Sequence, residues 1–295
     1  MEFTTPAPQA KEKVQLTGVE KTMLMTTFLK YHDAKSASPI LGDPSAEQLL
    51  SGCDLGPVED GFGSLSDKRY VQQIVGRTKR IDDWCQDFLD THARAGTPVT
   101  VLHVACGIDC RFLRVRKAAG AVRWIDLDLP PVVDLRKRLI PSPSEAENVD
   151  YTLRALSAGS EGWLNDTPAD RPTLVILEGV LYYLEPELVI KIFRDVVAHF
   201  RKYSGEVLFD TVGPLSTRFS RYVLPLKPSG ASWKWSIDNA PSEMSAIDPR
   251  LKMKDRVFWT DYMHSHPPFF GPVMSRLVAL HPQWRRNLQY LRFEF

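Results

Sequence analysis

Between residues 99 and 214 the chain alternates between short apolar runs and helix-like segments, and this alternation limits its fold more than any other feature. The runs are TVLHVACG, VRWIDLDLP, TLVILEGVLYYL and EVLFDTVGP, which are rich in aliphatic and β-branched residues. Apolar residues at helical spacing lie between them, at residues 109–119, 132–139 and 187–203. Strands that alternate with helices predict parallel strands joined by crossovers, and therefore an α/β fold.

The flanking sequence predicts further elements around this core. Helical periodicity covers residues 16–32, with Thr17 and Glu20 as a capping box, and it returns at residues 69–95. Residues 242–251 and 274–282 are expected to be helical, and residues 287–295 to form a final strand. We expect a flexible N-terminus over 1–15 and a single domain over 16–295, divided into a helical cover (16–96) and a core (97–295) with a substrate-side insertion around 214–270.

Charge and cysteine content argue against several classes of protein. The chain has 37 Lys and Arg residues against 36 Asp and Glu, so it lacks the basic excess of a general nucleic-acid binder. Its four cysteines form no Cys-x-x-Cys pair, which is typical of reduced thiols rather than a zinc site. No apolar run approaches the ~20 residues of a membrane-spanning helix, and the N-terminus is unlike a signal peptide. We therefore expect a cytoplasmic protein with neither a nucleic-acid nor a membrane partner, and no metal.

The residues that end each apolar run are the first candidates for a binding site. In an open parallel sheet the ligand lies beyond the carboxyl ends of the strands. The first run ends at the small residues Ala105 and Gly107, which let a ligand approach the backbone closely. The second run ends at Asp128, where a carboxylate about 20 residues past such a turn accepts hydrogen bonds from a ribose. The third run ends at Glu178.

The first turn also favours one kind of ribose ligand over another. A dinucleotide site would carry G-x-G-x-x-G, whereas this turn has a single glycine and places Asp109 near a helix start. Asp109 would repel a pyrophosphate and would suit a cationic ligand without phosphates, such as S-adenosylmethionine. A nucleotide-dependent oxidoreductase is therefore the weaker alternative.

Several stretches of the chain resemble, in order, the leucine carboxyl methyltransferase family. They are LTGVEKTMLMTTFLKYHDAKSASPILGDPSA, ACGIDCRFLRV, WIDLDLPPVVDLRKRL, ILEGVLYYLEPE, LFDTVGP and WKWSIDN. Their most similar branch is the polyketide O-methyltransferases of the tetracenomycin type, and LTGV, DLDLP and EGVLYYL are the most specific stretches. The resemblance covers nearly the whole chain from Leu16 onward.

This resemblance implies a class I methyltransferase fold, with seven strands, the last antiparallel, and an N-terminal helical cover. It implies S-adenosylmethionine as cofactor and S-adenosylhomocysteine as product. By motif match, Arg77 is expected to bind the cofactor carboxylate, Gly107 to form the close turn, Asp128 to hold the ribose and Glu178 to lie beside the methionine moiety or substrate. The remaining predicted cofactor contacts are Ala105, Asp109, Leu129 and Ser157. Two substitutions depart from the family turn: Ala105 replaces a glycine and Cys110 a threonine.

The expected acceptor is a small aromatic acid or phenol, and each would need different help. A carboxylate is ionised at neutral pH and needs a cationic clamp, for which Arg218 and Arg221 are candidates. A phenol benefits from a base, which His264 or its neighbour His266 would supply. Glu178 and Tyr182 complete the catalytic candidates. If the third run is extended, at most one of Tyr182 and Tyr183 faces the cleft.

Other polar residues have plainer interpretations. Asp126 is expected to be structural, and His103, inside a predicted strand, to be a hydrogen-bonded core histidine. Three functional alternatives stay open: a methyltransferase that esterifies the C-terminal carboxylate of a protein, the oxidoreductase, and an inactive cofactor-binding subunit. A homodimer is also left open.

Overall fold

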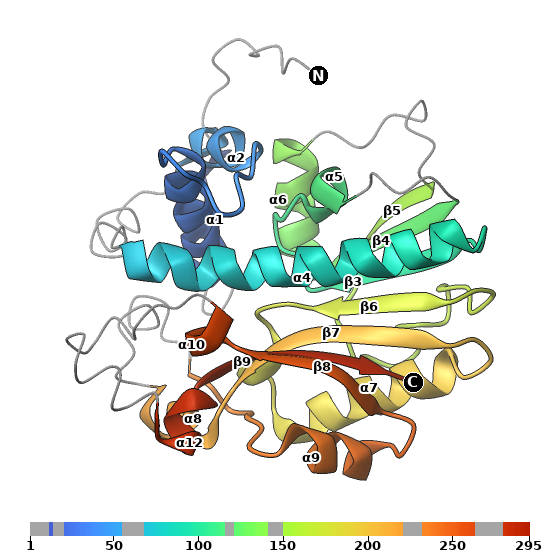
Figure 1. Cartoon of the computed structure of the whole chain (residues 1–295). Helices are drawn as coiled ribbons and strands as arrows, with labels where there is room; N and C mark the ends of the chain where they lie inside the picture. Colours follow the sequence, from blue (N-terminus) through green and yellow to red (C-terminus); the bar gives the residue numbers. More distant parts are fainter. Residues whose placement is uncertain are drawn as a thin grey trace.

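The central element is a seven-stranded sheet with the order β5-β4-β3-β6-β7-β9-β8 (Figure 1). The computed structural model describes residues 12–13, 21–54, 68–115, 121–140, 150–220, 232–262 and 280–295. The strands are β3 (Val99–Val104), β4 (Val122–Asp128), β5 (Asp150–Ala155), β6 (Thr173–Leu177), β7 (Gly205–Val212), β8 (Lys252–Phe258) and β9 (Leu288–Glu294). Neighbours from β5 to β7 are parallel, and β9 is antiparallel to both β7 and β8. The predicted α/β fold and its reversed last strand are confirmed.

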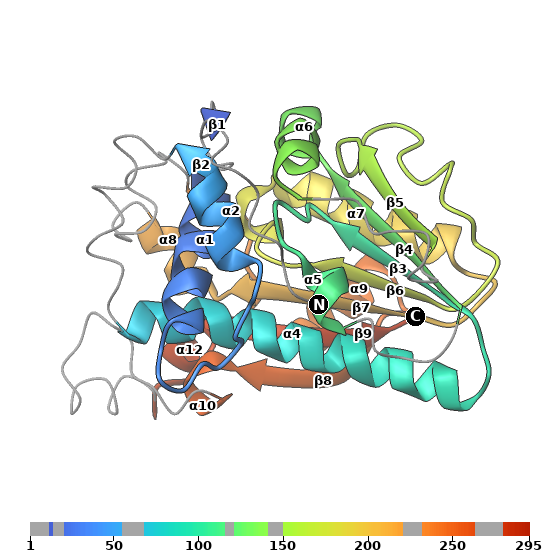
Figure 2. The same cartoon turned by 90° about the horizontal axis from the view of Figure 1, so that it is seen from above.

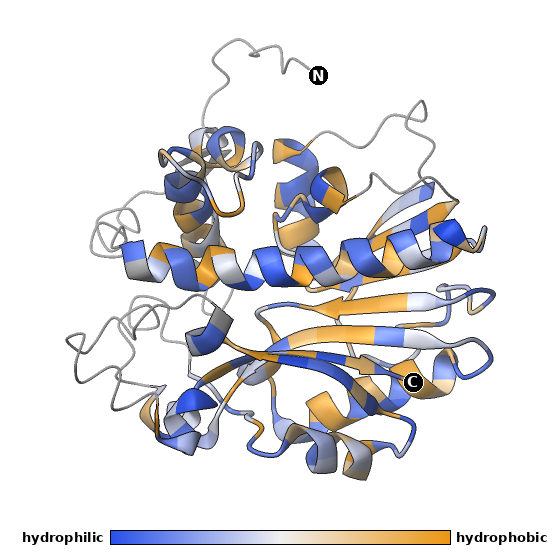
Figure 3. Ribbon diagram, viewed as in Figure 1, coloured by the Kyte–Doolittle hydropathy of each residue, from blue (hydrophilic) through white to orange (hydrophobic). Residues whose placement is uncertain are grey.

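Helices bury both faces of this sheet. Helices α4 (Lys68–Arg94) and α5 (Arg111–Val115) cover one face, and α7 (Pro186–His199) and α9 (Ala240–Ile247) cover the other (Figure 2). Every residue of β3, β6 and β7 is buried, which explains why these strands are almost continuously apolar rather than alternating (Figure 3).

A helical cover lies at the carboxyl edge of the sheet. It consists of α1 (Lys21–Ala34) and α2 (Ala46–Gly52), which pack on α4 and α6 (Pro130–Leu139) through Leu24, Leu49, Val75 and Leu135. Asp33, in the last turn of α1, accepts hydrogen bonds on its carboxylate from the backbone nitrogens of residues 40, 41 and 42, in the loop that leads to α2, at 2.8–2.9 Å. The region 16–96, predicted to be one helical cover, therefore has two parts: α1 and α2 form the cover, and α4 packs on a face of the sheet.

Shorter elements complete the described chain. They are the paired β1 (Glu12–Lys13) and β2 (Cys53–Asp54), the 3₁₀ helix η4 (Leu181–Tyr183), and α8 (Pro214–Phe219), α10 (Trp259–Tyr262) and α12 (Pro282–Arg285).

Three features differ from the sequence-based expectations. The third apolar run is a strand only to Leu177, because Gly179, at φ +71°, turns the chain into η4. Tyr182 and Tyr183 therefore lie on a 3₁₀ turn and not on an extended strand. Strand β5 forms where none was identified, and β8 lies within the region 214–270 assigned to an insertion, where it is an edge strand of the main sheet.

Some expectations fall outside the described residues. These include the capping pair Thr17 and Glu20 and most of the helix expected over 274–282. The flexible N-terminus and the single-domain organisation stay predictions. Across the described residues, no helix has both the length and the apolar character needed to cross a membrane.

Candidate active site

A cavity of about 310 Å³ lies at the carboxyl ends of β3, β4 and β6, with α1 over it. Strand β3 lies between β4 and β6, so the order of the strands reverses at this edge. Ligands of open α/β sheets bind at such a reversal. The volume falls at the lower end of the ≈300–1,000 Å³ range of small-molecule sites.

Asp128, the last residue of β4, forms part of the cavity wall and fixes the neighbouring backbone. Its Oδ2 atom accepts a hydrogen bond from the backbone nitrogen of Gly107 at 2.6 Å, and Oδ1 accepts one from that of Leu129 at 2.7 Å. Burial raises the pKa of Asp128, and these two backbone donors oppose that rise. Each carboxylate oxygen has a second lone pair, so Asp128 retains acceptor capacity for a ligand hydroxyl.

The turn after β3 depends on two residues in left-handed backbone conformation. Ala105 has φ +52° and Gly107 has φ +57°. A Cβ atom at Gly107 would lie 3.0 Å from the Met23 sulfur on α1, so glycine is needed for both the backbone angle and the close approach of the cover. Ala105 adopts an angle that alanine reaches only at a cost of roughly 1–2 kcal/mol.

Glu178 is held as an anion beneath the cavity. Its Oε1 atom accepts hydrogen bonds from Arg77 Nε at 2.9 Å and Thr78 Oγ1 at 2.7 Å, and Oε2 contacts Arg111 Nη2. Burial alone would raise the pKa of Glu178, but the Arg111 and Arg77 guanidiniums outweigh it and the pKa lies well below its usual value. Glu178 therefore remains ionised at neutral pH and is a poor general base.

Arg77 reaches the same place from α4. Its Nη1 atom lies 3.0 Å from the Tyr182 hydroxyl and 3.3 Å from Asp210 Oδ2, while Nε bonds Glu178. Burial would lower the pKa of Arg77, yet Asp210, Tyr182 and Glu178 raise it, so the guanidinium stays charged.

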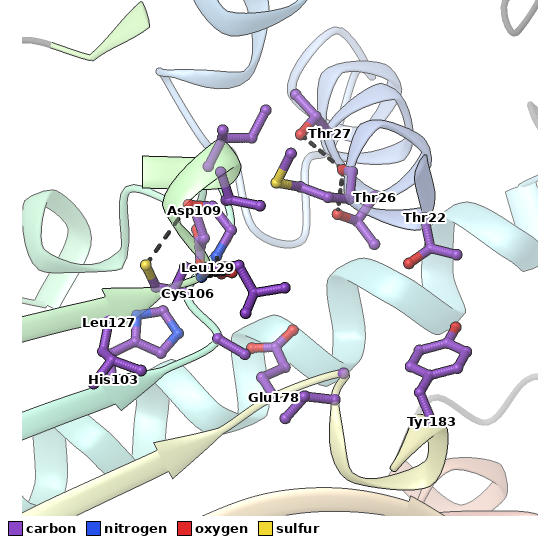
Figure 4. Close-up of a pocket in the computed structure, with 18 of the residues that line it drawn as sticks. Thr22, Thr26, Thr27, His103, Cys106, Asp109, Leu127, Leu129, Glu178 and Tyr183 are labelled. Carbon is purple, nitrogen blue, oxygen red and sulfur yellow. Dashed lines mark hydrogen bonds between the residues drawn. The ribbon is translucent and has the colours of Figure 1, made fainter. Parts of the chain in front are cut away.

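Asp109 is surrounded by cations rather than free. Lys30 of α1 donates to its Oδ1 atom at 3.0 Å, and Arg114 donates to both carboxylate oxygens at 2.7 and 3.2 Å. Burial opposes ionisation, but Arg114, Lys30 and Arg111 hold the pKa of Asp109 well below its usual range. Asp109 lines the cavity, as expected (Figure 4), but its negative charge, on which the sequence-based preference for a cationic ligand rests, is paired with cations of the protein.

The charged groups of the cavity wall are unequal in sign. Two cations, Lys30 and Arg77, line the cavity. Four carboxylates line it as well, namely Asp43, Asp109, Asp128 and Glu178. Arg111 and Arg114, behind the wall, form ion pairs with Asp43, Asp109 and Glu178, which brings the cations around the cavity to four, whereas Asp128 forms no ion pair with any described residue.

All eight predicted cofactor contacts line this one cavity: Arg77, Ala105, Gly107, Asp109, Asp128, Leu129, Ser157 and Glu178. They come from α4, the turn after β3, the end of β4, the loop after β5 and the turn after β6. Their contacts with a cofactor stay predictions.

The predicted catalytic residues are less well grouped. Tyr182 is buried behind the wall and bonds Arg77, whereas its neighbour Tyr183 lines the cavity. Arg218 is exposed on α8 and does not line the cavity, so the structure gives it no part in a clamp there. Arg221, His264 and His266 lie outside the described residues.

Sequence reasoning missed the cations that organise the site. Lys30 lies on the cover helix, and Arg111 and Arg114 lie three residues apart on α5, directly after the turn. That spacing on one helix face, next to Asp109, was the available signal. Thr22 on α1 was also missed; it lines the cavity on the same side as the Tyr183 hydroxyl (Figure 4).

Asp126 has the structural role expected of it, whereas His103, expected in the core, lines the cavity. Asp126 is 1% exposed and accepts hydrogen bonds from Trp124 Nε1 at 2.7 Å, Tyr151 at 2.9 Å and Arg136 at 2.5 Å. His103 Nε2 lies 2.9 Å from Arg111 Nη1, which helps to fix the guanidinium that holds Glu178.

Comparison with known proteins agrees with this geometry. A family model described as leucine carboxyl methyltransferase matches residues 23–197. The chain belongs to the leucine carboxyl methyltransferase family. It is 35% identical over 287 residues to the tetracenomycin polyketide synthesis O-methyltransferase TcmP of Streptomyces glaucescens, covering 96% of this chain and 99% of that protein.

A second relative and two solved structures extend the comparison. The chain is 34% identical over 261 residues to the S-adenosyl-L-methionine-dependent methyltransferase dpfgK of Gibberella zeae, covering 84% and 85% of the two chains. The fold is shared with a putative methyltransferase from Thermobifida fusca (TM-score 0.51, 13% identity, 90% and 93% covered) and a DUF574 family protein from Streptomyces avermitilis (TM-score 0.52, 11% identity, 91% and 95% covered). The predicted enzyme class, an S-adenosylmethionine-dependent methyltransferase of this family, is confirmed.

Proposed function

We propose that the cavity binds S-adenosylmethionine and that the enzyme methylates a carboxylate or hydroxyl oxygen of a small aromatic or polyketide-type acceptor in secondary metabolism. The observation that carries this proposal is the place of Asp128, which faces a cavity at the reversal of strand order and bonds the Gly107 backbone. The tetracenomycin relative, which this chain matches over nearly its full length, supports methylation at an oxygen atom of a polyketide-type acceptor.

The residues present fit the cofactor from end to end. Asp128 would accept hydrogen bonds from the ribose hydroxyls, and Gly107 leaves room against the backbone. Arg77 would hold the carboxylate of the methionine end, and Glu178 lies beside it in the cavity wall. Leu129 and Ser157 would flank the nucleoside.

The chain's contribution to methyl transfer is orientation and charge. S-adenosylmethionine, when bound, supplies a methyl group already activated on a sulfonium. The fixed guanidinium of Arg77 and the ionised Glu178 would hold it in one orientation, and such positioning supplies much of the rate. Because Glu178 stays ionised, we assign it positioning and not proton transfer. Thr22 and Tyr183 mark the part of the cavity toward which we place the acceptor.

The test is methyl transfer from labelled S-adenosylmethionine to a panel of aromatic acids and phenols, followed by mass spectrometry. A labelled small acid or phenol, lost in Asp128→Asn, is the expected result. Label on the C-terminal carboxylate of a peptide would instead favour the protein methyltransferase, and uptake of NAD(P) without S-adenosylmethionine would favour the oxidoreductase. Cofactor uptake with no product across the panel would favour an inactive binding subunit.

We also propose a cytoplasmic location. The thiols of Cys85, Cys106 and Cys110 are buried and unpaired, as is usual for proteins kept in a reducing compartment. The homodimer stays a proposal that sedimentation or light scattering of the purified protein would test.

A further inference from the structure

A buried carboxylate on β7 connects two parts of the site without lining the cavity. Asp210 is 0% exposed, and its Oδ1 atom accepts a hydrogen bond from the backbone nitrogen of Gly179 at 2.6 Å. Its Oδ2 atom lies 3.3 Å from Arg77 Nη1. One side chain therefore contacts both the turn after β6 and the guanidinium that lies against that turn.

The guanidinium of Arg77 is fixed along two of its three nitrogens. Glu178 holds Nε, and Asp210 and the Tyr182 hydroxyl hold Nη1. The third nitrogen, Nη2, lies 3.2 Å from the place that a Cβ atom would take at Gly179, whose φ of +71° already favours glycine. The close packing of guanidinium and turn thus needs both the missing side chain of Gly179 and the anchor that Asp210 provides.

Removing this anchor would change the site in a defined way. Removing one partner of a buried ion pair leaves the other charge without full compensation. For Arg77, loss of the Asp210 charge would leave Glu178 at Nε and the Tyr182 hydroxyl at Nη1, so the guanidinium would be held less firmly against Gly179.

We infer that Asp210 is a positioning residue for cofactor binding, which acts through Arg77 by holding its guanidinium against the Gly179 turn. This inference rests on the proposed function, because it takes Arg77 as the contact for the methionine end of the cofactor. Asp210 itself touches neither cofactor nor acceptor.

A double-mutant cycle separates this role from a merely structural one. S-adenosylhomocysteine is titrated calorimetrically into the wild type, Asp210→Asn, Arg77→Met and the double variant. Asparagine keeps an oxygen for the Gly179 nitrogen and removes the charge that faces Arg77. We expect Asp210→Asn to weaken binding about tenfold in the wild-type background and less than twofold when Arg77 is already methionine. In turnover, KM for S-adenosylmethionine should rise while kcat changes less than threefold.

A matched control lies on the same strand. Glu206 is 7% exposed and bonds Arg292 Nε at 2.5 Å, so Glu206→Gln removes a similar buried charge among residues that do not line the cavity. Its affinity for S-adenosylhomocysteine should stay within twofold of the wild type. If Asp210→Asn does not fold, Tyr182→Phe is the alternative variant, because it removes the other Nη1 contact without changing the charge. We expect Tyr182→Phe to weaken S-adenosylhomocysteine binding two- to threefold. That loss should disappear when Arg77 is already methionine.

The outcomes are distinct. Wild-type affinity in Asp210→Asn, an equal loss in both backgrounds, or an equal loss in Glu206→Gln would overturn the inference while leaving the proposed function intact. If Tyr182→Phe is used in place of Asp210→Asn, unchanged affinity, or an equal loss of affinity in both backgrounds, would likewise overturn the inference. Failure of the wild type to bind S-adenosylhomocysteine would remove the proposed function, and the inference with it.

Discussion

The Oδ2 atom of Asp128 accepts a hydrogen bond from the backbone nitrogen of Gly107 at 2.6 Å, across 21 residues of sequence. This contact joins the end of β4 to the turn after β3. It places an acidic side chain and a glycine, both expected at a nucleoside site, on the same wall of the cavity. The turn and the carboxylate therefore form one binding element.

Replacing Asp128 should remove much of the cofactor affinity. Asp128→Ala deletes an ionised acceptor for the ribose, and a hydrogen bond to a charged group contributes about 1.5–3 kcal/mol. Calorimetry with S-adenosylhomocysteine measures the loss. Asp134→Ala, which removes an exposed carboxylate on α6, is the control and should bind as the wild type does. If Asp128→Ala and Asp134→Ala bind S-adenosylhomocysteine with equal affinity, Asp128 does not contact the cofactor.

Gly107→Ala should damage both stability and binding. The new Cβ atom would meet the Met23 sulfur at 3.0 Å, and the left-handed backbone at φ +57° adds roughly 1–2 kcal/mol to the cost. Gly96→Ala is a close control, because Gly96 has φ +64° but nothing within 4 Å of its Cβ position. Urea unfolding should show a loss in both variants, whereas weaker S-adenosylhomocysteine binding should appear only in Gly107→Ala. Normal binding by Gly107→Ala would mean that the cover need not approach the turn.

Lys30 should connect the cover to the sheet. Its Nζ atom is 3.0 Å from Asp109 Oδ1, and both side chains are largely buried, at 8% and 13% exposure. Lys30→Met should lower the free energy of unfolding by about 1.5–3 kcal/mol, the range for a charged hydrogen bond. Lys35 pairs with Glu47 at 50% and 60% exposure, so Lys35→Met should cost at most about 1 kcal/mol. Equal costs for the two lysines would contradict a structural role for the Lys30 pair.

Acid should weaken the fold through Glu178. Its pKa in the folded state lies below the usual 4.5, because Arg111 and Arg77 outweigh burial. The unfolded chain therefore binds more protons once the pH falls below about 4.5, and the stabilisation present above that pH is progressively lost. Unfolding in urea between pH 7 and pH 3.5 should show this decline. Glu178→Gln should be less stable at pH 7, but its free energy of unfolding should fall less steeply with pH than that of the wild type. The same slope in both proteins would rule out Glu178 as a contributor to the acid sensitivity.

The sequence predicted those parts of the fold whose signal is local. Strands β3, β6 and β7 are buried on both faces and so appear as continuous apolar runs. The polar residue that follows or ends a strand, Asp128 or Glu178, could then be placed at the carboxyl edge by topology alone. Asp128 and Glu178 do line one cavity, as this topology predicts, and their contacts with a cofactor stay predictions.

Edge strands and long-range ion pairs could not be predicted in the same way. The sequence KMKDRVF of β8 is mostly charged, and DYTLRA of β5 alternates only weakly; both are edge strands that need little burial. Lys30 and Asp109 lie 79 residues apart, and Arg77 and Glu178 lie 101 apart, so no local pattern announces either pair. The 3₁₀ turn at Leu181–Tyr183 was missed because its aliphatic and aromatic residues also suit a strand.

A crystal structure of the protein with S-adenosylhomocysteine would test the central claim most directly. The account predicts the ribose hydroxyls within hydrogen-bond distance of the Asp128 carboxylate and the homocysteine end beside Arg77 and Glu178. A nucleoside bound away from the carboxyl ends of β3 and β4, with Asp128 contacting only backbone, would contradict it.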